Sequence, residues 1–168
     1  MKLDLTPLKF SDGGSKKYHF CEQLPDLELG GETYVFLSPV NVELQVTKSG
    51  RTYFAKGLVK CTVEASCSKC LKKIPFTLEF NFEDEFVPAH DAPNSEEDSF
   101  FFENDSFSIA ERISEHILLH LPMRFTCSES CRGLCPQCGI NLNTDFCNCK
   151  DENIDPRLEI LSKWNKGV

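Results

Sequence analysis

Residues 127–149 read CSESCRGLCPQCGINLNTDFCNC and contain six of the ten cysteines of this 168-residue chain. Within the stretch, Cys135 and Cys138 lie three residues apart and Gly139 follows directly, which is the arrangement of a zinc knuckle. Gly139 can adopt a positive φ, so that backbone amides point back at the sulfur atoms. A tetrahedral Zn²⁺ needs two further thiolates, and the last two cysteines of the stretch are close enough to supply them. The stretch therefore predicts a structural metal site.

Eight of the cysteines form four close pairs along the chain, and eight thiolates suit two sites of four ligands each. The most local grouping gives one site from Cys135, Cys138, Cys147 and Cys149 and a second from Cys67, Cys70, Cys127 and Cys131. A rival grouping joins the 67/70 pair to the 135/138 pair, and the sequence does not decide between the two. If all four ligands of a site come from the chain, the metal keeps no open position, which predicts a structural ion.

The N-terminal decapeptide MKLDLTPLKF has no apolar core of the signal-peptide kind, and no apolar run is long enough to span a bilayer. We therefore expect a cytoplasmic protein with no membrane partner. In a reducing cytosol, clustered cysteines favour a bound metal, with disulfides as the alternative.

The net charge of −8 is concentrated in one segment. Residues 81–116 carry eleven acidic side chains against one basic, whereas residues 1–80 carry nine acidic against eleven basic and residues 117–168 carry six of each. One interpretation is a solvated acidic loop. The other is a segment that repels nucleic acid from one face, or that covers a site until a partner displaces it.

Residues 32–87 have the period-2 alternation of half-buried strands, which predicts an antiparallel sheet with one apolar face. The expected strands are 33–37, 40–46, 51–66 and 74–83, with a bulge at Gly57 in the third. Residues 1–31 are less regular, although 2–10 is compatible with a strand. Cys21 has no partner at ligand spacing and is expected to be a small buried residue.

Cys67-Ser68-Lys69-Cys70 lies between the two longest predicted strands, at the tip of a hairpin. A redox CxxC of the thioredoxin kind opens a helix after a strand, so this context favours metal. Basic side chains surround the cysteine pairs and are candidates for phosphate contacts, with a solvated turn as the alternative interpretation. These candidates for RNA binding are Lys69, Lys72, Lys73, Arg124 and Arg132.

Residues 88–105 are predicted to be an acidic linker of low order. Within it, Phe100-Phe101-Phe102 is expected to dock as a short strand against the sheet, with an exposed partner-binding patch as the alternative.

A helix is predicted over 108–121, opened by a capping box of Ser108 and Glu111 and carrying a buried stripe of isoleucines. His116 and His120 on this helix are not expected to bind metal. A second short helix is predicted from Asp155, with Pro156 at its first position.

The sequence thus predicts an α+β fold. A mainly antiparallel β domain occupies residues 1–87, the acidic linker spans 88–105, and residues 106–168 supply the packed helix, the cysteine-rich zinc module and a short C-terminal helix on the same core.

Five motifs follow one another along the chain: CSKCL (67–71), HLP (120–122), CRGLCPQCGINLN (131–143), CNC (147–149) and DPRLEIL (155–161). This succession resembles the YceD family, the large ribosomal RNA subunit accumulation proteins, over about residues 50–165. The resemblance implies a non-enzymatic bacterial factor of ribosome biogenesis that supports accumulation of large-subunit (23S) ribosomal RNA. Its expected partner is that RNA or a pre-ribosomal particle, and zinc is expected to stabilise the fold.

Two other functions remain open from the sequence. One is a protein-interaction adaptor that binds a basic ribosomal or assembly protein without touching RNA. The other is a thiol redox or zinc-responsive protein. The chain has no Gly-rich phosphate loop and no Ser/His/Asp spacing, so neither an enzyme nor a small-molecule substrate is expected.

Overall fold

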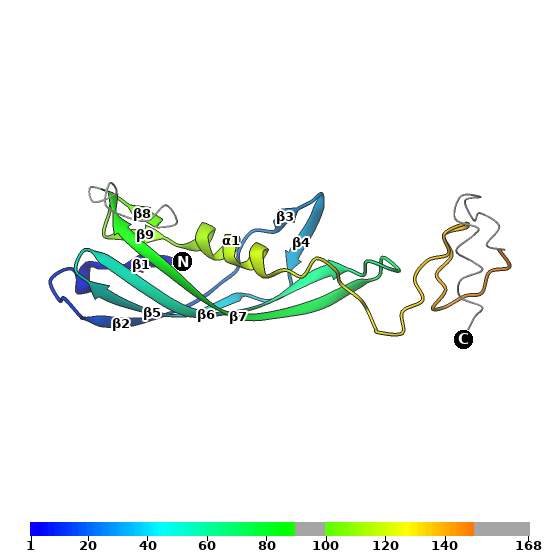
Figure 1. Ribbon diagram of the computed structural model, residues 1–168, viewed down its shortest axis with the longest axis horizontal. Coiled ribbons are helices and arrows are strands. Elements are labelled where there is room, and N and C mark those ends of the chain that lie inside the picture. Colours follow the sequence, from blue (N-terminus) through cyan, green and yellow to red (C-terminus); the bar gives the residue numbers. More distant parts are fainter. Residues whose placement is uncertain (90–99, 150–168) are drawn as a thin grey trace, which may run out of the picture.

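The computed structural model describes residues 1–89 and 100–149, and these form a mainly antiparallel β structure with one α-helix (Figure 1). The elements are β1 (Lys2–Asp4), a 3-10 helix η1 (Thr6–Leu8), β2 (Ser15–Glu22), β3 (Leu27–Leu29), β4 (Glu32–Phe36), β5 (Val40–Ser49), β6 (Thr52–Ser66), β7 (Lys73–Pro88), β8 (Phe100–Phe102), β9 (Ser106–Ser108) and α1 (Ala110–His120). The predicted C-terminal helix and the centre of the acidic linker lie outside the described residues.

Seven strands form one sheet, and the long β6–β7 hairpin is its spine. On one side β6 pairs with β5 and then with β4, and β5 in turn pairs with β2. On the other side β7 pairs in parallel with β8, which confirms that the three phenylalanines dock as a strand. Strands β1 and β9 form a separate antiparallel pair.

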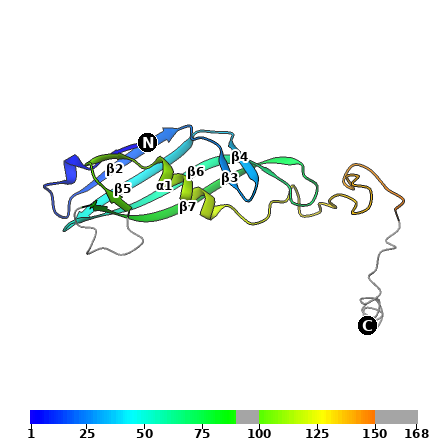
Figure 2. The same ribbon diagram turned by 90° about the horizontal axis from the view of Figure 1, so that it is seen from above.

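Helix α1 covers one face of this sheet, and Figure 2 shows it lying over β6 and β7. The predicted stripe is buried, because Ile109, Ile113 and Ile117 are each at most 1% exposed. They pack into one core with the alternating apolar residues of the strands below. No helix among the described residues is long and apolar enough to cross a membrane.

The helix begins later than predicted, and its capping box does not form. Ser108 ends β9, and its Oγ accepts a hydrogen bond from the amide of Ala110 at 3.3 Å. Ile109 takes the N-cap position, without a side-chain cap, and its amide donates to the carbonyl of Met1. Pairing of β9 with β1 therefore overrides the local capping signal.

Two expectations for the N-terminal region need correction, and one strand there was missed. The strand predicted over 2–10 stops at Asp4, because the Asp4 carboxylate accepts hydrogen bonds from Thr6 and Pro7 has no amide for a ladder. Strand β2 was not predicted. Cys21 is exposed rather than buried, because Tyr18 and Phe20 occupy the inward positions of β2 and leave the odd residues facing outward.

Gly57 does not form a bulge, because the register of β6 with both neighbouring strands runs through it without interruption. A Cβ at this position would lie 2.5 Å from the ring of Phe82 and 2.8 Å from the carbonyl oxygen of Glu43. Glycine is therefore needed here because the Phe82 ring occupies the space above the strand.

A Gly57→Ala variant is accordingly expected to lower the free energy of unfolding by about 1–3 kcal/mol, through overpacking against Phe82. Urea unfolding measures the change. The control is Lys56→Ala at the neighbouring position, whose side chain is 69% exposed, and the expected effect is below about 0.5 kcal/mol. A Gly57→Ala protein that unfolds at the same urea concentration as the wild type would contradict the close contact between residue 57 and Phe82.

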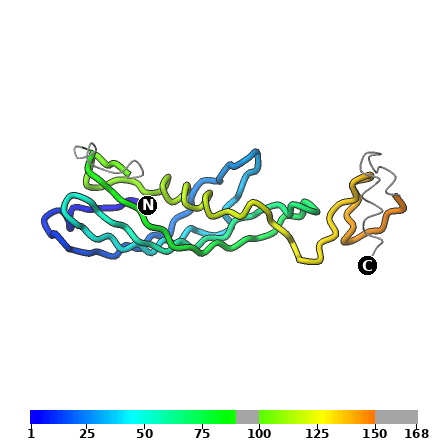
Figure 3. The backbone as a smooth tube through the Cα atoms, in the orientation of Figure 1, coloured from blue at the N-terminus to red at the C-terminus, as the bar shows by residue number. Residues whose placement is uncertain are grey.

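Beyond α1 the chain runs back to the tip of the β6–β7 hairpin and continues into a cysteine-rich module that projects past it, as the tube in Figure 3 shows. Phe125 anchors this return, with its ring buried between Tyr34 and Phe76. Its backbone also pairs with Ser68, because the amide of Ser68 donates to the Phe125 carbonyl at 2.8 Å.

Candidate metal centres

The structure gathers eight cysteines into two groups of four, with all sulfur atoms of a group within 4.8 Å of one another. We call the first the tip cluster and the second the terminal cluster. The tip cluster consists of Cys67, Cys70, Cys127 and Cys131, and the terminal cluster of Cys135, Cys138, Cys147 and Cys149. These are the two groups of the most local sequence grouping, so the rival that joined the 67/70 pair to the 135/138 pair is wrong.

The tip cluster joins the β6–β7 hairpin to the segment after α1. The Sγ atoms of Cys67 and Cys131 lie 3.9 Å apart, and those of Cys70 and Cys127 lie 3.6 Å apart. Around a tetrahedral ion with bonds of about 2.3 Å, sulfur atoms lie about 3.8 Å apart. The spacing therefore fits a bound Zn²⁺, whereas a disulfide would need about 2.05 Å.

The backbone of the hairpin tip has the shape of a metal knuckle. The amide of Leu71 donates to the carbonyl of Cys67 at 2.9 Å, and Leu71 has a φ of 60°. Hydrogen bonds from backbone amides, that of Cys70 foremost, lower the pKa of Cys67 to about 6. The thiolate that a metal requires is therefore favoured at this position.

The terminal cluster repeats this geometry. The amide of Gly139 donates to the carbonyl of Cys135 at 2.9 Å, and Gly139 has a φ of 73°. The amides of Cys138 and Gln137 lower the pKa of Cys135 to about 6. Gly139 was the conformational signal in the sequence, but the equivalent Leu71 was not recognised, since leucine rarely adopts a positive φ.

Four thiols in contact do not all ionise without a cation. The pKa of Cys127 is raised to about 12, chiefly by its hydrogen bond to the more readily ionised Cys131. The pKa of Cys149 is also raised to about 12, chiefly by its hydrogen bond with Cys138. Each cluster thus combines a thiolate with thiols that a soft divalent cation would deprotonate. All ten cysteines are free of disulfides.

The two clusters differ in exposure. Three cysteines of the tip cluster are buried and Cys127 is half-buried, whereas Cys138 and Cys149 of the terminal cluster are exposed. A metal in the tip cluster would be enclosed by the hairpin and by the chain that returns from α1. One in the terminal cluster would be more accessible to solvent.

The five basic candidates for RNA contact lie around the tip cluster, but two of them have partners in the protein. Lys69 donates to the carbonyl of Cys131 at 3.3 Å, and Lys73 forms an ion pair with Glu64 at 3.6 Å. Lys72, Arg124 and Arg132 are exposed, and their side chains have no hydrogen-bond or ion-pair partner among residues 1–89 and 100–149.

His116 and His120 are engaged within the fold and belong to neither cluster. Nε2 of His116 lies 2.8 Å from the carboxylate of Asp84 on β7. The ring of His120 stacks on Phe80 with 3.9 Å between the ring centres.

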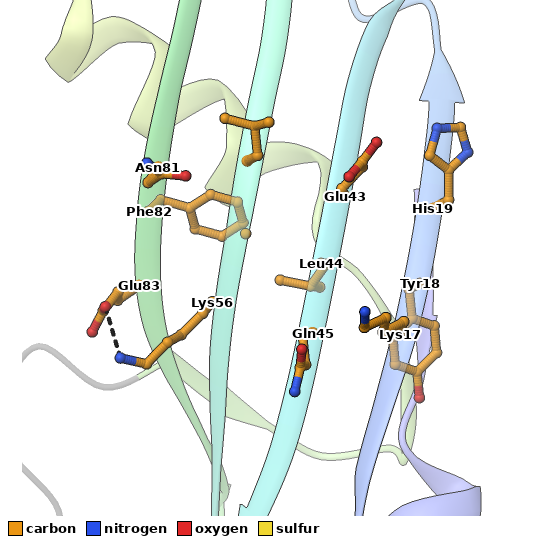
Figure 4. A pocket seen from close by; sticks show the side chains of 12 residues that line it. Lys17, Tyr18, His19, Glu43, Leu44, Gln45, Lys56, Asn81, Phe82 and Glu83 are labelled. Carbon is orange, nitrogen blue, oxygen red and sulfur yellow. Dashed lines mark hydrogen bonds and ion pairs between the residues drawn. The ribbon is translucent and has the colours of Figure 1, made fainter.

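A shallow depression of about 780 Å³ lies on the face of the sheet opposite α1 (Figure 4). The charged side chains in its lining include Lys17, Lys56, Glu43 and Glu83, and Lys56 pairs with Glu83 at 2.8 Å. Because these charges balance, the depression offers no excess charge of either sign to a ligand.

Residues 55–164 match the model of the family described as large ribosomal RNA subunit accumulation protein YceD. An uncharacterized protein of Bacillus subtilis, YlbN, is 28% identical over 77% of this chain and 76% of its own length. A chloroplastic YCED homolog 1 of Zea mays is 27% identical over 70% of this chain and 50% of its own length.

An uncharacterized protein of Mycobacterium tuberculosis is 25% identical over 70% of this chain and 58% of its own length. No solved structure matches. The family match covers β6 from residue 55 onward, all of β7 and α1, and all eight clustered cysteines. The chain belongs to the YceD family.

Proposed function

We propose that this protein is a non-enzymatic, cytoplasmic factor of ribosome biogenesis that supports accumulation of large-subunit (23S) ribosomal RNA and is stabilised by zinc. The family match over residues 55–164 carries the proposal. The maize relative is named as a large ribosomal RNA subunit accumulation protein homolog, and so is a relative from Arabidopsis thaliana.

Zinc is the metal proposed for both clusters, because four thiolates at tetrahedral spacing are its usual structural ligand set. The tip cluster would hold the chain after α1 against the β6–β7 hairpin, and the terminal cluster would close the loop that follows. Bound there, zinc supplies cross-links and no open coordination position. The chain's own residues would then make every contact with the partner.

The proposed RNA contact is the exposed basic surface of Lys72, Arg124 and Arg132 beside the tip cluster. All three lie close to backbone segments that the tip cluster joins, so metal binding would hold them in place together. Lys69 and Lys73 lie at the same tip, although each already has a partner. Five of the eleven acidic residues of segment 81–116 lie on β7 and α1, and none of the three basic residues belongs to either element.

A triple charge reversal of Lys72, Arg124 and Arg132 to glutamate is expected to weaken binding to 23S ribosomal RNA fragments by at least about tenfold near 0.1 M salt. The plot of log affinity against log salt concentration has a negative slope, and this slope should become less steep by about 2. Each phosphate contact on single-stranded RNA contributes about 0.7 to its magnitude, and the variant removes three such contacts. Filter binding over a salt series measures both quantities.

The matched control reverses three exposed lysines away from the tip, Lys2, Lys17 and Lys56, and should change affinity much less. Equal losses in both variants would show that the charge of the whole protein, and not the tip, governs binding. Wild-type affinity that does not change with salt would exclude phosphate contacts altogether.

The second candidate is an adaptor that binds a basic ribosomal or assembly protein without touching RNA. The net charge of −8, with its excess in residues 81–116, favours this alternative. Crosslinking in cells followed by recovery of bound RNA separates the two. Large-subunit RNA crosslinked to the protein supports direct contact, whereas a ribosomal protein retained after nuclease treatment, with no crosslinked RNA, supports the adaptor.

A further inference from the structure

Asn143 connects the two cysteine clusters. In the sequence it lies within the loop that the terminal cluster closes, between Cys138 and Cys147. Its side chain nevertheless reaches the tip cluster, because Nδ2 donates to the Sγ of Cys131 at 3.5 Å. Its Oδ1 accepts a hydrogen bond from the amide of Arg132 at 2.8 Å. One side chain therefore holds both the sulfur of a tip ligand and the backbone that follows it.

The loop fixes the position of this side chain. The Oδ1 of Asn141 accepts hydrogen bonds from the Asn143 amide at 3.0 Å and from its Nδ2 at 2.7 Å. The amide of Leu142 donates to the carbonyl of Gly133 at 2.9 Å, and that of Cys135 donates to the carbonyl of Ile140 at 2.8 Å. Asn143 is thus placed by the folded loop of the terminal cluster.

The segment shared by the two clusters is short and is held from both sides. Only three residues separate Cys131 of the tip cluster from Cys135 of the terminal cluster. Between them, the amide of Leu134 donates to the carbonyl of Lys69 in the hairpin at 3.0 Å. A Cβ on Gly133 would lie 3.0 Å from that same carbonyl, so the segment lies close against the hairpin. A displacement of either cluster is therefore transmitted to the other.

We propose that the two clusters bind metal as one coupled unit, with Asn143 as the positioning residue that links the state of the terminal cluster to the metal affinity of the tip cluster. The inference rests on the proposed metal binding. Without metal in the terminal cluster, its loop is no longer closed and Asn143 leaves Cys131. The tip ligand then loses a hydrogen bond that orients its sulfur, and such outer-shell contacts typically change metal affinity by about 10–100-fold.

The difference in exposure predicts the order in which the two clusters lose metal. Cys138 and Cys149 are exposed, so a chelator reaches the terminal cluster first. Loss of that metal would then weaken the enclosed tip cluster, which holds Lys72, Arg124 and Arg132 in place. Because coupling is reciprocal, metal in the tip cluster must strengthen the terminal cluster by the same factor.

A double-mutant cycle on the full-length chain tests the coupling. Cys138→Ser removes one exposed ligand and empties the terminal cluster, leaving the four tip ligands intact. The tip-cluster affinity for Cd²⁺ is measured by chelator competition, with cadmium NMR to resolve the two sites. We expect Cys138→Ser to lower the tip affinity about 10–100-fold in the wild-type background and less than about twofold when Asn143 is already alanine.

Asn148→Ala is the matched control, because Asn148 is an exposed asparagine of the same segment whose side chain has no partner among the described residues. In that background, Cys138→Ser should retain its full effect. The inference would be overturned if Cys138→Ser lowered the Cd²⁺ affinity of the tip cluster equally with Asn143 present and with alanine in its place. It would also be overturned if Cys138→Ser left this affinity unchanged in both backgrounds. Either result would leave the proposal of metal binding intact. A wild-type chain that binds no metal would overturn the metal proposal as well.

Discussion

A Cys67→Ser variant is expected to bind one metal ion per chain, where two are expected for the wild type, and to release the segment after α1 from the hairpin. Cys67 is fully buried, and its sulfur lies 3.9 Å from that of Cys131. A serine hydroxyl is a poor ligand for Zn²⁺ among thiolates. The loss of affinity should exceed the roughly 10–100-fold that changes outside the ligand set cause.

Elemental analysis of natively purified protein measures the metal content, and limited proteolysis between α1 and Cys127 reports the release. Cys21→Ser is the control, since Cys21 is exposed on β2 and belongs to neither cluster. It should keep two ions and the wild-type cleavage pattern. A Cys67→Ser protein that retains both ions would show that the tip cluster does not bind metal through this cysteine.

An Asp84→Asn variant is expected to lower the free energy of unfolding by about 3 kcal/mol, because it removes the buried carboxylate that accepts charge-assisted hydrogen bonds from two half-buried partners. Asp84 is the one buried charged residue among those described, with its side chain 2% exposed. Arg112 donates to Oδ1 through Nε at 3.0 Å and through Nη2 at 2.8 Å, and His116 lies 2.8 Å from Oδ2. The carboxylate therefore fastens α1 to β7.

Glu83→Gln is the matched control, because Glu83 is the preceding residue on β7 and its side chain is 71% exposed. Its effect should stay within about 0.5 kcal/mol. Urea unfolding of both variants gives the comparison. If the two substitutions lower the free energy of unfolding equally, the contacts of Asp84 with Arg112 and His116 contribute no more than a surface ion pair.

The contacts of Asp84 with Arg112 and His116 should also depend on pH, and the pKa of Asp84 gives the direction. Burial raises this pKa, but hydrogen bonds from His116 and Arg112 outweigh burial and lower it below its ordinary value of 3.8. The pKa of Asp84 is lower in the folded protein than in the unfolded chain. The ionised carboxylate therefore stabilises the fold fully above the unfolded-state pKa, and this stabilisation is lost as the pH falls through the folded-state pKa. The difference in stability between wild type and Asp84→Asn should therefore shrink below about pH 4.

Much of the fold follows from local sequence patterns. Alternation along β5, β6 and β7 and the four-residue spacing of Ile109, Ile113 and Ile117 predicted the sheet face and the buried helix stripe. The spacing of the cysteines offered both groups of four as the most local grouping, but it left open the rival that joined the 67/70 pair to the 135/138 pair. The order of the motifs was enough to indicate the family.

Tertiary structure decided the features that depend on residues distant in sequence. Pairing of β1 with β9 replaced the capping box at Ser108, and the Phe82 ring, not a bulge, explains Gly57. The tip cluster joins cysteines some sixty residues apart, and Asn143 gives no local signal of its contact with Cys131. Periodicity and short spacings report contacts that close small loops, so they can be read from the sequence. Contacts across long loops carry a larger entropic cost of loop closure, which is offset only when the whole core forms. These long-range contacts determine which side chains meet at the cysteine clusters.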